Sequence, residues 1–277
     1  MENDLHNRNN LRIIFFNSFV YFMLAYFSVV LFANLIAMLL GVTNGFSGTL
    51  YYYGFILTEA AGSRWSKDVV FQVFMLGPGI TFITGVIFER LYKQKRKYSG
   101  IFKMYFFWLY VLSFTWFLGN IVVGGLANYG IGAAFKSFSI PLLFRVVFSV
   151  LAVAGLVLLG YFSRLHVLIS ANTYLSFIRI ADFKKFLMYQ VVFPALTANV
   201  LIFLLKIPHH ADFNYLDSLV VLCVFLFVVG LFLSHFNLQS INFKHHKRII
   251  EVVALPSLIL IIVILAIRVG LSFGLTI

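Results

Sequence analysis

Polar side chains interrupt the long apolar runs of this chain, and they are the residues best placed to do chemistry. Polar groups are uncommon in such runs and usually face a bundle interior or a water-filled cavity. The residues are Asn34, Gln72, Asn120, Arg145 and Asn199. If successive runs cross the membrane in alternate directions, all five residues lie toward the same side of the membrane. They predict a polar cavity open at one end; the alternative is hydrogen bonding between helices, with Arg145 reaching the membrane surface.

Glu59 is the acidic residue nearest to Arg145 in this predicted topology. It lies in the connection after the first apolar run, on the side where Arg145 enters the fourth. A charge at that depth either reaches the interface or finds a partner of opposite charge. We hypothesise that Glu59 and Arg145 pair and close the predicted cavity; independent solvation of both is the alternative.

The histidines include two adjacent pairs, His209-His210 and His245-His246. Adjacent positions on a helix point about 100° apart, so neither pair places two ligands on one helix face. His209, His210 and Asp212 are the weak candidates for a metal site in a loop, against the simpler interpretation of a polar surface loop. The second pair precedes Lys247 and Arg248 and fits a basic surface.

Apolar runs near the ~20 residues that cross a bilayer dominate the chain. Apolar residues make up 62% of it and charged residues 11%, and the mean hydropathy is +0.98. The runs are Phe15–Leu40, Val69–Tyr92, Ile101–Val123, Ile140–Phe162, Phe186–Ile207, Ser218–Phe236 and Val252–Gly274. Spanning segments without the alternation of a membrane barrel must be helical. We expect an all-α, multi-pass transmembrane bundle of about seven helices, forming a single domain over residues 1–277.

Positive charges fall on alternate connections between these runs. The second, fourth and sixth connections hold most of them, including Arg96, Lys184 and Lys247. Lys and Arg in short loops stay on the cytoplasmic side, which predicts a cytoplasmic N-terminus in a cell (inner) membrane. The net charge of +12 is therefore a loop property, suited to anionic lipid headgroups rather than to nucleic acid.

The first connection contains an apolar piece, Leu50–Ala61, that is too short to span. We expect it to form a re-entrant or interfacial segment. Glycines from Gly119 to Gly132 indicate tight turns or close backbone approach. Trp65, Trp108, Trp116 and the tyrosines at 51–53 lie near the ends of runs, where aromatic rings favour the membrane–water boundary. The single cysteine, Cys223, lies inside an apolar run and supports no disulfide framework.

One stretch of the chain resembles a known enzyme family. It runs Asn34-Leu35-Ile36-Ala37-Met38-Leu39-Leu40-Gly41-Val42, then a glycine-containing loop, then Leu76-Gly77-Pro78-Gly79-Ile80. This order resembles the zinc-binding helix, its Gly-Val exit and the Gly-Pro helix start of the site-2-protease class of intramembrane metalloproteases. The resemblance covers about the first third of the chain, and it implies a relationship to an intramembrane protease.

The chain departs from that family at the metal site. The positions that match the family's His-Glu-x-x-His motif are Val29–Ala33, whose side chains cannot hold zinc. Leu216-Asp217-Ser218 only poorly matches the family's later Asp-Gly metal motif. The charge pattern also places the 41–68 connection outside, opposite to the family. The resemblance therefore implies a catalytically inactive relative without bound zinc.

These observations favour a non-enzymatic integral membrane protein that acts as an accessory or binding component, without a cofactor. Its expected partners are membrane lipids and another membrane protein. The first alternative is a small-solute transporter or permease subunit that uses the predicted cavity, which broken helices with polar groups near the midplane would favour. The second is an intramembrane enzyme, which a cluster of metal ligands or carboxylates would favour.

Overall fold

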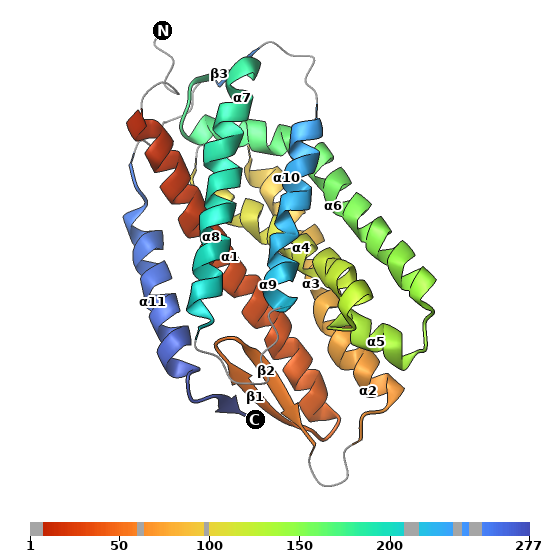
Figure 1. The fold of residues 1–277 in the computed structure, drawn as a ribbon. Coiled ribbons are helices and arrows are strands. Elements are labelled where there is room, and N and C mark those ends of the chain that lie inside the picture. Colours follow the sequence, from red (N-terminus) through yellow and green to blue (C-terminus); the bar gives the residue numbers. More distant parts are fainter. Residues whose placement is uncertain (1–7, 60–63, 97–99, 208–215, 235–239, 244–250) are drawn as a thin grey trace.

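The computed structural model is a bundle of long helices with a small sheet at one end (Figure 1). It describes residues 8–59, 64–96, 100–207, 216–234, 240–243 and 251–277. The helices are α1 (Arg8–Thr43), α2 (Lys67–Phe71), α3 (Gly77–Lys95), α4 (Lys103–Ala127), α5 (Ile131–Ser137), α6 (Leu142–Ser170), α7 (Ile180–Leu187), α8 (Phe193–Leu205), α9 (Leu216–Leu222), α10 (Val224–Leu233) and α11 (Ala254–Gly270). The predicted all-α bundle is confirmed at this level.

Six helical stretches in the described part of the chain are long and apolar enough to cross a membrane. Several combine shorter helices, such as α2 with α3, α7 with α8, and α9 with α10. The seventh predicted crossing, Val252–Gly274, contains α11, which is 17 residues long and therefore about 25 Å in length. The structure thus supports a membrane bundle, while α11 is shorter than each of these six stretches.

Helix α4 forms the centre of the bundle and α6 its edge. In the most apolar 18-residue segment of α4, 72% of the residues are buried, whereas in that of α6 only 17% are buried. The exposed side chains of α6 include Leu143, Leu151 and Phe162. Because lipid tails solvate such side chains, an apolar outer face on α6 fits a bilayer and not water.

Glycines let two helices approach closely at the edge of the bundle. A Cβ atom added to Gly160 of α6 would lie 1.9 Å from the carbonyl oxygen of Phe227, and one added to Gly230 of α10 would lie 1.9 Å from that of Val157. Side chains at either position would push the helices apart. Small residues at helix contacts are typical of membrane proteins, where close backbone packing replaces the hydrophobic effect.

The 41–68 connection contains a β-hairpin, which was not predicted from the sequence. Strand β1 (Ser47–Tyr51) pairs with β2 (Gly54–Thr58) on one side and with β5 (Leu275–Thr276) on the other, both antiparallel. The apolar segment Leu50–Ala61 does not cross the bundle, as expected, but its described part is mostly extended strand. The C-terminal strand thus lies beside the hairpin at the lower end of the bundle in Figure 1.

Two of the crossings contain a π-helical segment just before a proline. Gln72–Leu76 precedes Pro78, and Met188–Val192 precedes Pro194. Proline cannot donate a backbone hydrogen bond, and its ring crowds the preceding turn, so a widened turn relieves the strain. Both crossings are therefore interrupted helices.

The basic connections gather at the end of the bundle opposite the hairpin. Strand β3 (Phe177–Arg179) pairs with β4 (Ser240–Asn242), which joins the fourth and sixth predicted connections. The Asn172 amide donates to the Arg96 carbonyl over 3.2 Å, which brings the second connection alongside. We call this the basic end, and the end that carries β1 and β2 the hairpin end.

Candidate functional site

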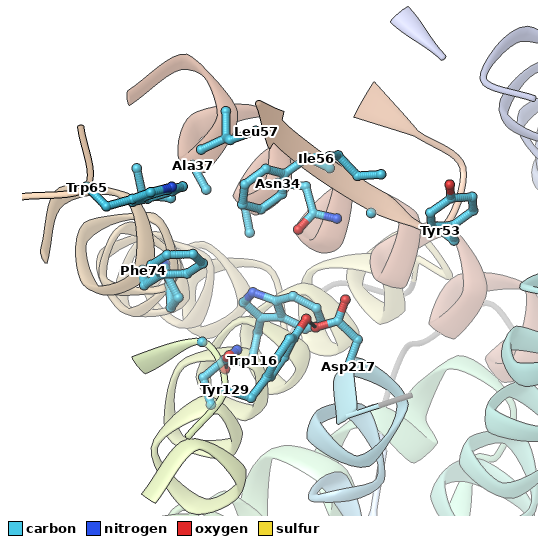
Figure 2. Close-up of a pocket in the computed structure, with 17 residues that line it drawn as sticks. Asn34, Ala37, Tyr53, Ile56, Leu57, Trp65, Phe74, Trp116, Tyr129 and Asp217 are labelled. Atoms are coloured by element: carbon cyan, nitrogen blue, oxygen red, sulfur yellow. Dashed lines mark hydrogen bonds between the residues drawn. The ribbon is translucent and has the colours of Figure 1, made fainter. Parts of the chain in front are cut away.

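A cavity of about 260 Å³ lies at the hairpin end. Its lining comes from α1, the hairpin, the segment before α2, the first π-helical segment, α3, α4, the α4–α5 connection and α9 (Figure 2). Strand β2 covers one side, while α1 and α4 supply residues from within the bundle. A cavity of this size can hold a small organic molecule, since apolar cavities of about 150 Å³ already bind benzene in other proteins.

Asn34 is the clearest polar feature of the cavity. It lies on α1, its side chain is only 8% exposed, and the amide points into the space in Figure 2. No residue in the described parts of the chain forms a hydrogen bond with this amide. A buried amide without a partner is costly, particularly in a membrane, where no bulk water can satisfy it. The cavity therefore leaves a donor and an acceptor available to a bound molecule.

Asp217 supplies a carboxylate to the same cavity. It lies in the first turn of α9 and is 7% exposed. The Tyr129 hydroxyl donates to its Oδ1 over 2.6 Å. Burial, and then the Asp217 charge, raises the pKa of Tyr129 well above its ordinary value, so the phenol stays a donor. Figure 2 shows the carboxylate facing the space beside Asn34.

Asn120 and Trp116 line the cavity one turn apart on α4. The Asn120 amide donates to the Trp116 carbonyl over 2.8 Å, which leaves its Oδ1 beside Gly130. A Cβ atom at Gly130 would lie 2.5 Å from this oxygen, and Gly130 has a φ of +54°. Both the contact and the backbone conformation thus require glycine at this turn. The turn brings Tyr129 to Asp217.

Aromatic rings form much of the remaining wall. The rings of Trp65 and Phe74 are stacked with their centroids 5.8 Å apart, and Trp65 also contacts Phe46. Trp65 and Trp116 were predicted to lie at the membrane boundary; in the structure both line the cavity. A boundary position and a cavity wall are compatible for Trp65, which is 39% exposed, but Trp116 is buried inside the bundle.

Asn34 and Asn120 are therefore the predicted cavity residues that the structure brings together. Gln72 and Asn199 do not line the described cavity. The Gln72 Oε1 accepts from the Asn44 amide over 2.8 Å, which ties the end of α1 to the π-helical segment. The buried Asn199 amide donates to the Ala195 carbonyl one turn earlier in α8. These two amides serve helix contacts and local bonding, which was the alternative interpretation.

The structure gives Arg145 partners other than Glu59. Its guanidinium donates to the Ile140 carbonyl and to the Asn128 Oδ1, so it fastens the connection between α4 and α6. Glu59 is exposed at the end of β2. The ion pairs found among the described residues are Lys93–Glu89 and Arg179–Asp182. The hypothesis of a Glu59–Arg145 pair is not supported.

The proposed loop ligands His209, His210 and Asp212 lie outside the described residues. Within the described residues, no three His, Cys, Asp or Glu side chains come together in a way that could hold a metal ion. The family-matching positions Val29–Ala33 lie in α1.

Asp217, Tyr129 and the hairpin residues of the cavity were missed from the sequence. Asp217 was considered only as a poor match to a metal motif. An acidic residue at the start of an apolar run is by itself an indication of a functional site. Tyr129 lies in the glycine-rich stretch that predicted close backbone approach, and the contacts of Gly124 and Gly132 confirm that approach. The hairpin gave no such signal.

Comparison with known proteins gives no match to a family model, a curated protein or a solved structure.

Proposed function

We propose that this chain is an integral membrane protein that binds a small amphipathic molecule in the hairpin-end cavity. The observation that carries the proposal is the buried Asn34 amide, which has no hydrogen-bond partner among the described residues and faces the same space as the Asp217 carboxylate. Aromatic walls with a few convergent polar groups are typical of small-molecule sites. Binding fits the described lining better than catalysis, because its titratable groups are Asp217 and tyrosines rather than a pair of carboxylates or a nucleophile with a base.

The test uses three probes of similar shape, benzyl alcohol, benzylamine and benzoate, with purified protein in detergent. At least one should raise the apparent melting temperature of the wild type, because ligands that bind the folded state stabilise it. The Asn34→Phe variant should lose this shift, since the new ring fills the cavity without breaking a described hydrogen bond.

Val150→Phe is the matched control, because Val150 is 60% exposed on the outer face of α6. It should keep the wild-type response. If no probe shifts the melting temperature, or if Asn34→Phe responds like the wild type, the proposed binding function is wrong.

We further propose seven crossings in a cell (inner) membrane, with the basic end in the cytoplasm. The gathering of basic connections at one end supports this orientation, since positive loops are retained inside. The connections at that end also suit anionic headgroups. In intact cells, a cysteine at exposed Thr58, with Cys223 changed to Ala, should react with an impermeant thiol reagent, whereas one at exposed Lys95 should be protected. The reverse labelling pattern would show that the proposed orientation is wrong and that the basic end faces outward.

Solute transport is the second candidate function. The interruptions before Pro78 and Pro194 favour it, because broken helices are typical of transporter binding sites. Gln190, inside the second π-helical segment, is fully buried. Uptake of the bound probe into proteoliposomes, abolished by Asn34→Phe, would favour transport over binding alone.

A further inference from the structure

We infer that the molecule bound in the hairpin-end cavity is an organic cation, an amine carried on an apolar body. This inference rests on the proposed binding function and names the class of its ligand. It depends on the charge of the lining, on the rings around it and on the oxygen atoms left available.

The charge of the lining is opposite to that of the chain. The protein has 21 Lys and Arg against 9 Asp and Glu. The described lining nevertheless holds one carboxylate, Asp217, and no Lys, Arg or His. A buried carboxylate in a membrane bundle is unfavourable unless a positive charge or several hydrogen bonds compensate it. Tyr129 supplies one hydrogen bond to Oδ1.

Lys206 is a buried cation near Asp217, among the described residues. It follows the last residue of α8 and lines a separate, smaller cavity with Tyr26 and Arg268. Burial lowers the pKa of Lys206, an effect that the nearby Asp217 charge opposes. Lys206 thus offsets part of the Asp217 charge from outside the larger cavity, and a positive group of the ligand can offset more of it from inside.

The rings of the lining suit the same charge. Six aromatic side chains surround the space: Tyr53, Phe55, Trp65, Phe74, Trp116 and Tyr129. The face of an aromatic ring attracts a cation within about 6 Å, and this attraction is greatest where water is excluded. The apolar part of the ligand would rest on the same rings.

The available oxygen atoms complete the recognition. The Oδ1 atoms of Asn34 and Asn120 have no hydrogen-bond donor among the described residues, and both side chains line the cavity. A primary or secondary ammonium group has the donors for these oxygens and for Asp217. An anionic ligand would meet the Asp217 carboxylate, which repels it.

The experiment measures the dissociation constants of benzylamine, protonated at pH 7, and of benzyl alcohol and benzoate for the full chain in detergent. Benzylamine should bind at least tenfold more tightly than benzyl alcohol, and benzoate more weakly than both. Asp217→Asn keeps an acceptor for Tyr129 and should weaken benzylamine at least tenfold while changing benzyl alcohol less than threefold. Asp68→Asn, an exposed acid at the start of α2, is the matched control and should change neither.

Lys206→Met provides a second variant that removes a competing positive charge, and it should tighten benzylamine binding. Should benzyl alcohol or benzoate match benzylamine in the wild type, with binding lost in Asn34→Phe, the cation inference is wrong and the binding function stands. An unchanged benzylamine affinity in Asp217→Asn also overturns it. If none of the three probes binds, the binding function itself fails and the inference fails with it.

Discussion

At the basic end, buried polar side chains join helices that are distant in sequence, whereas at the hairpin end they surround a cavity. The Trp108 indole donates to the Ser18 hydroxyl over 3.0 Å, and Ser18 donates to the Gln190 carbonyl. The Tyr92 hydroxyl donates to the His166 carbonyl over 2.7 Å. By contrast, the described side chains that line the cavity form one hydrogen bond with each other, from Tyr129 to Asp217.

The difference separates two uses of polar groups in an apolar bundle. A polar atom that meets a protein partner stabilises one arrangement of the helices, because the alternative is an unpaired group in lipid. A polar atom left facing a cavity lowers stability and is available to a ligand. The described hydrogen bonds of Trp108 and Tyr92 hold helices together at the basic end. Under the binding proposal, the polar groups of the hairpin end serve a ligand.

The largest expected effect comes from Trp108→Ala at the fixed end. Trp108 is fully buried, packs edge-on against Phe22 at 4.8 Å between ring centroids, and donates to Ser18. Truncation leaves a large void and costs about 3–5 kcal/mol. Trp65→Ala at the hairpin end should cost about 1 kcal/mol, because that ring is partly exposed. The measurement is the apparent melting temperature in detergent, and equal losses would contradict the comparison.

The helices and their order were predictable because each spanning segment needs a long apolar run, whatever its neighbours. The charges of the connections also predicted which of them gather at one end, and β3 with β4 confirms this for the fourth and sixth. The length of α11 was overestimated, because Val252 and Phe273 are apolar without being helical. Apolar residues outside helices cannot be separated from helical ones by hydropathy alone.

The hairpin was not predictable in the same way. Strand β1 pairs locally with β2 across a short turn, but β1 also pairs with β5 near residue 277. Only the second pairing, over such a separation, leaves no local pattern. Asn34 and Asn120 were among the predicted cavity residues because they lie where polar residues are rare, and both line the described cavity. Asn199 and Gln72 are as rare by type, but they do not line the described cavity. Which polar side chains face a cavity depends on how the helices pack, and the sequence does not contain that information.

The sharpest test of the comparison is a matched pair of substitutions on α1, Asn17→Leu and Asn34→Leu. Leucine resembles asparagine in shape and removes the amide. Asn17 is fully buried at the basic end; its amide donates to the Glu251 carbonyl over 3.1 Å and its Oδ1 accepts from the Val253 backbone N–H over 3.0 Å. Losing these bonds leaves two backbone groups before α11 unpaired, so Asn17→Leu should cost about 2 kcal/mol.

Asn34→Leu should instead raise stability by about 1 kcal/mol without ligand, because it removes an amide that has no partner among the described residues. Both changes in stability are measured as shifts of the apparent melting temperature of the ligand-free protein in detergent. The two variants can be compared directly because both substitutions lie on the same helix. The test depends on the signs of the two stability changes rather than on their sizes. If Asn34→Leu destabilises as Asn17→Leu does, the Asn34 amide is bonded within the protein. The hairpin end would then be held together like the basic end, and its cavity would have no polar group reserved for a ligand.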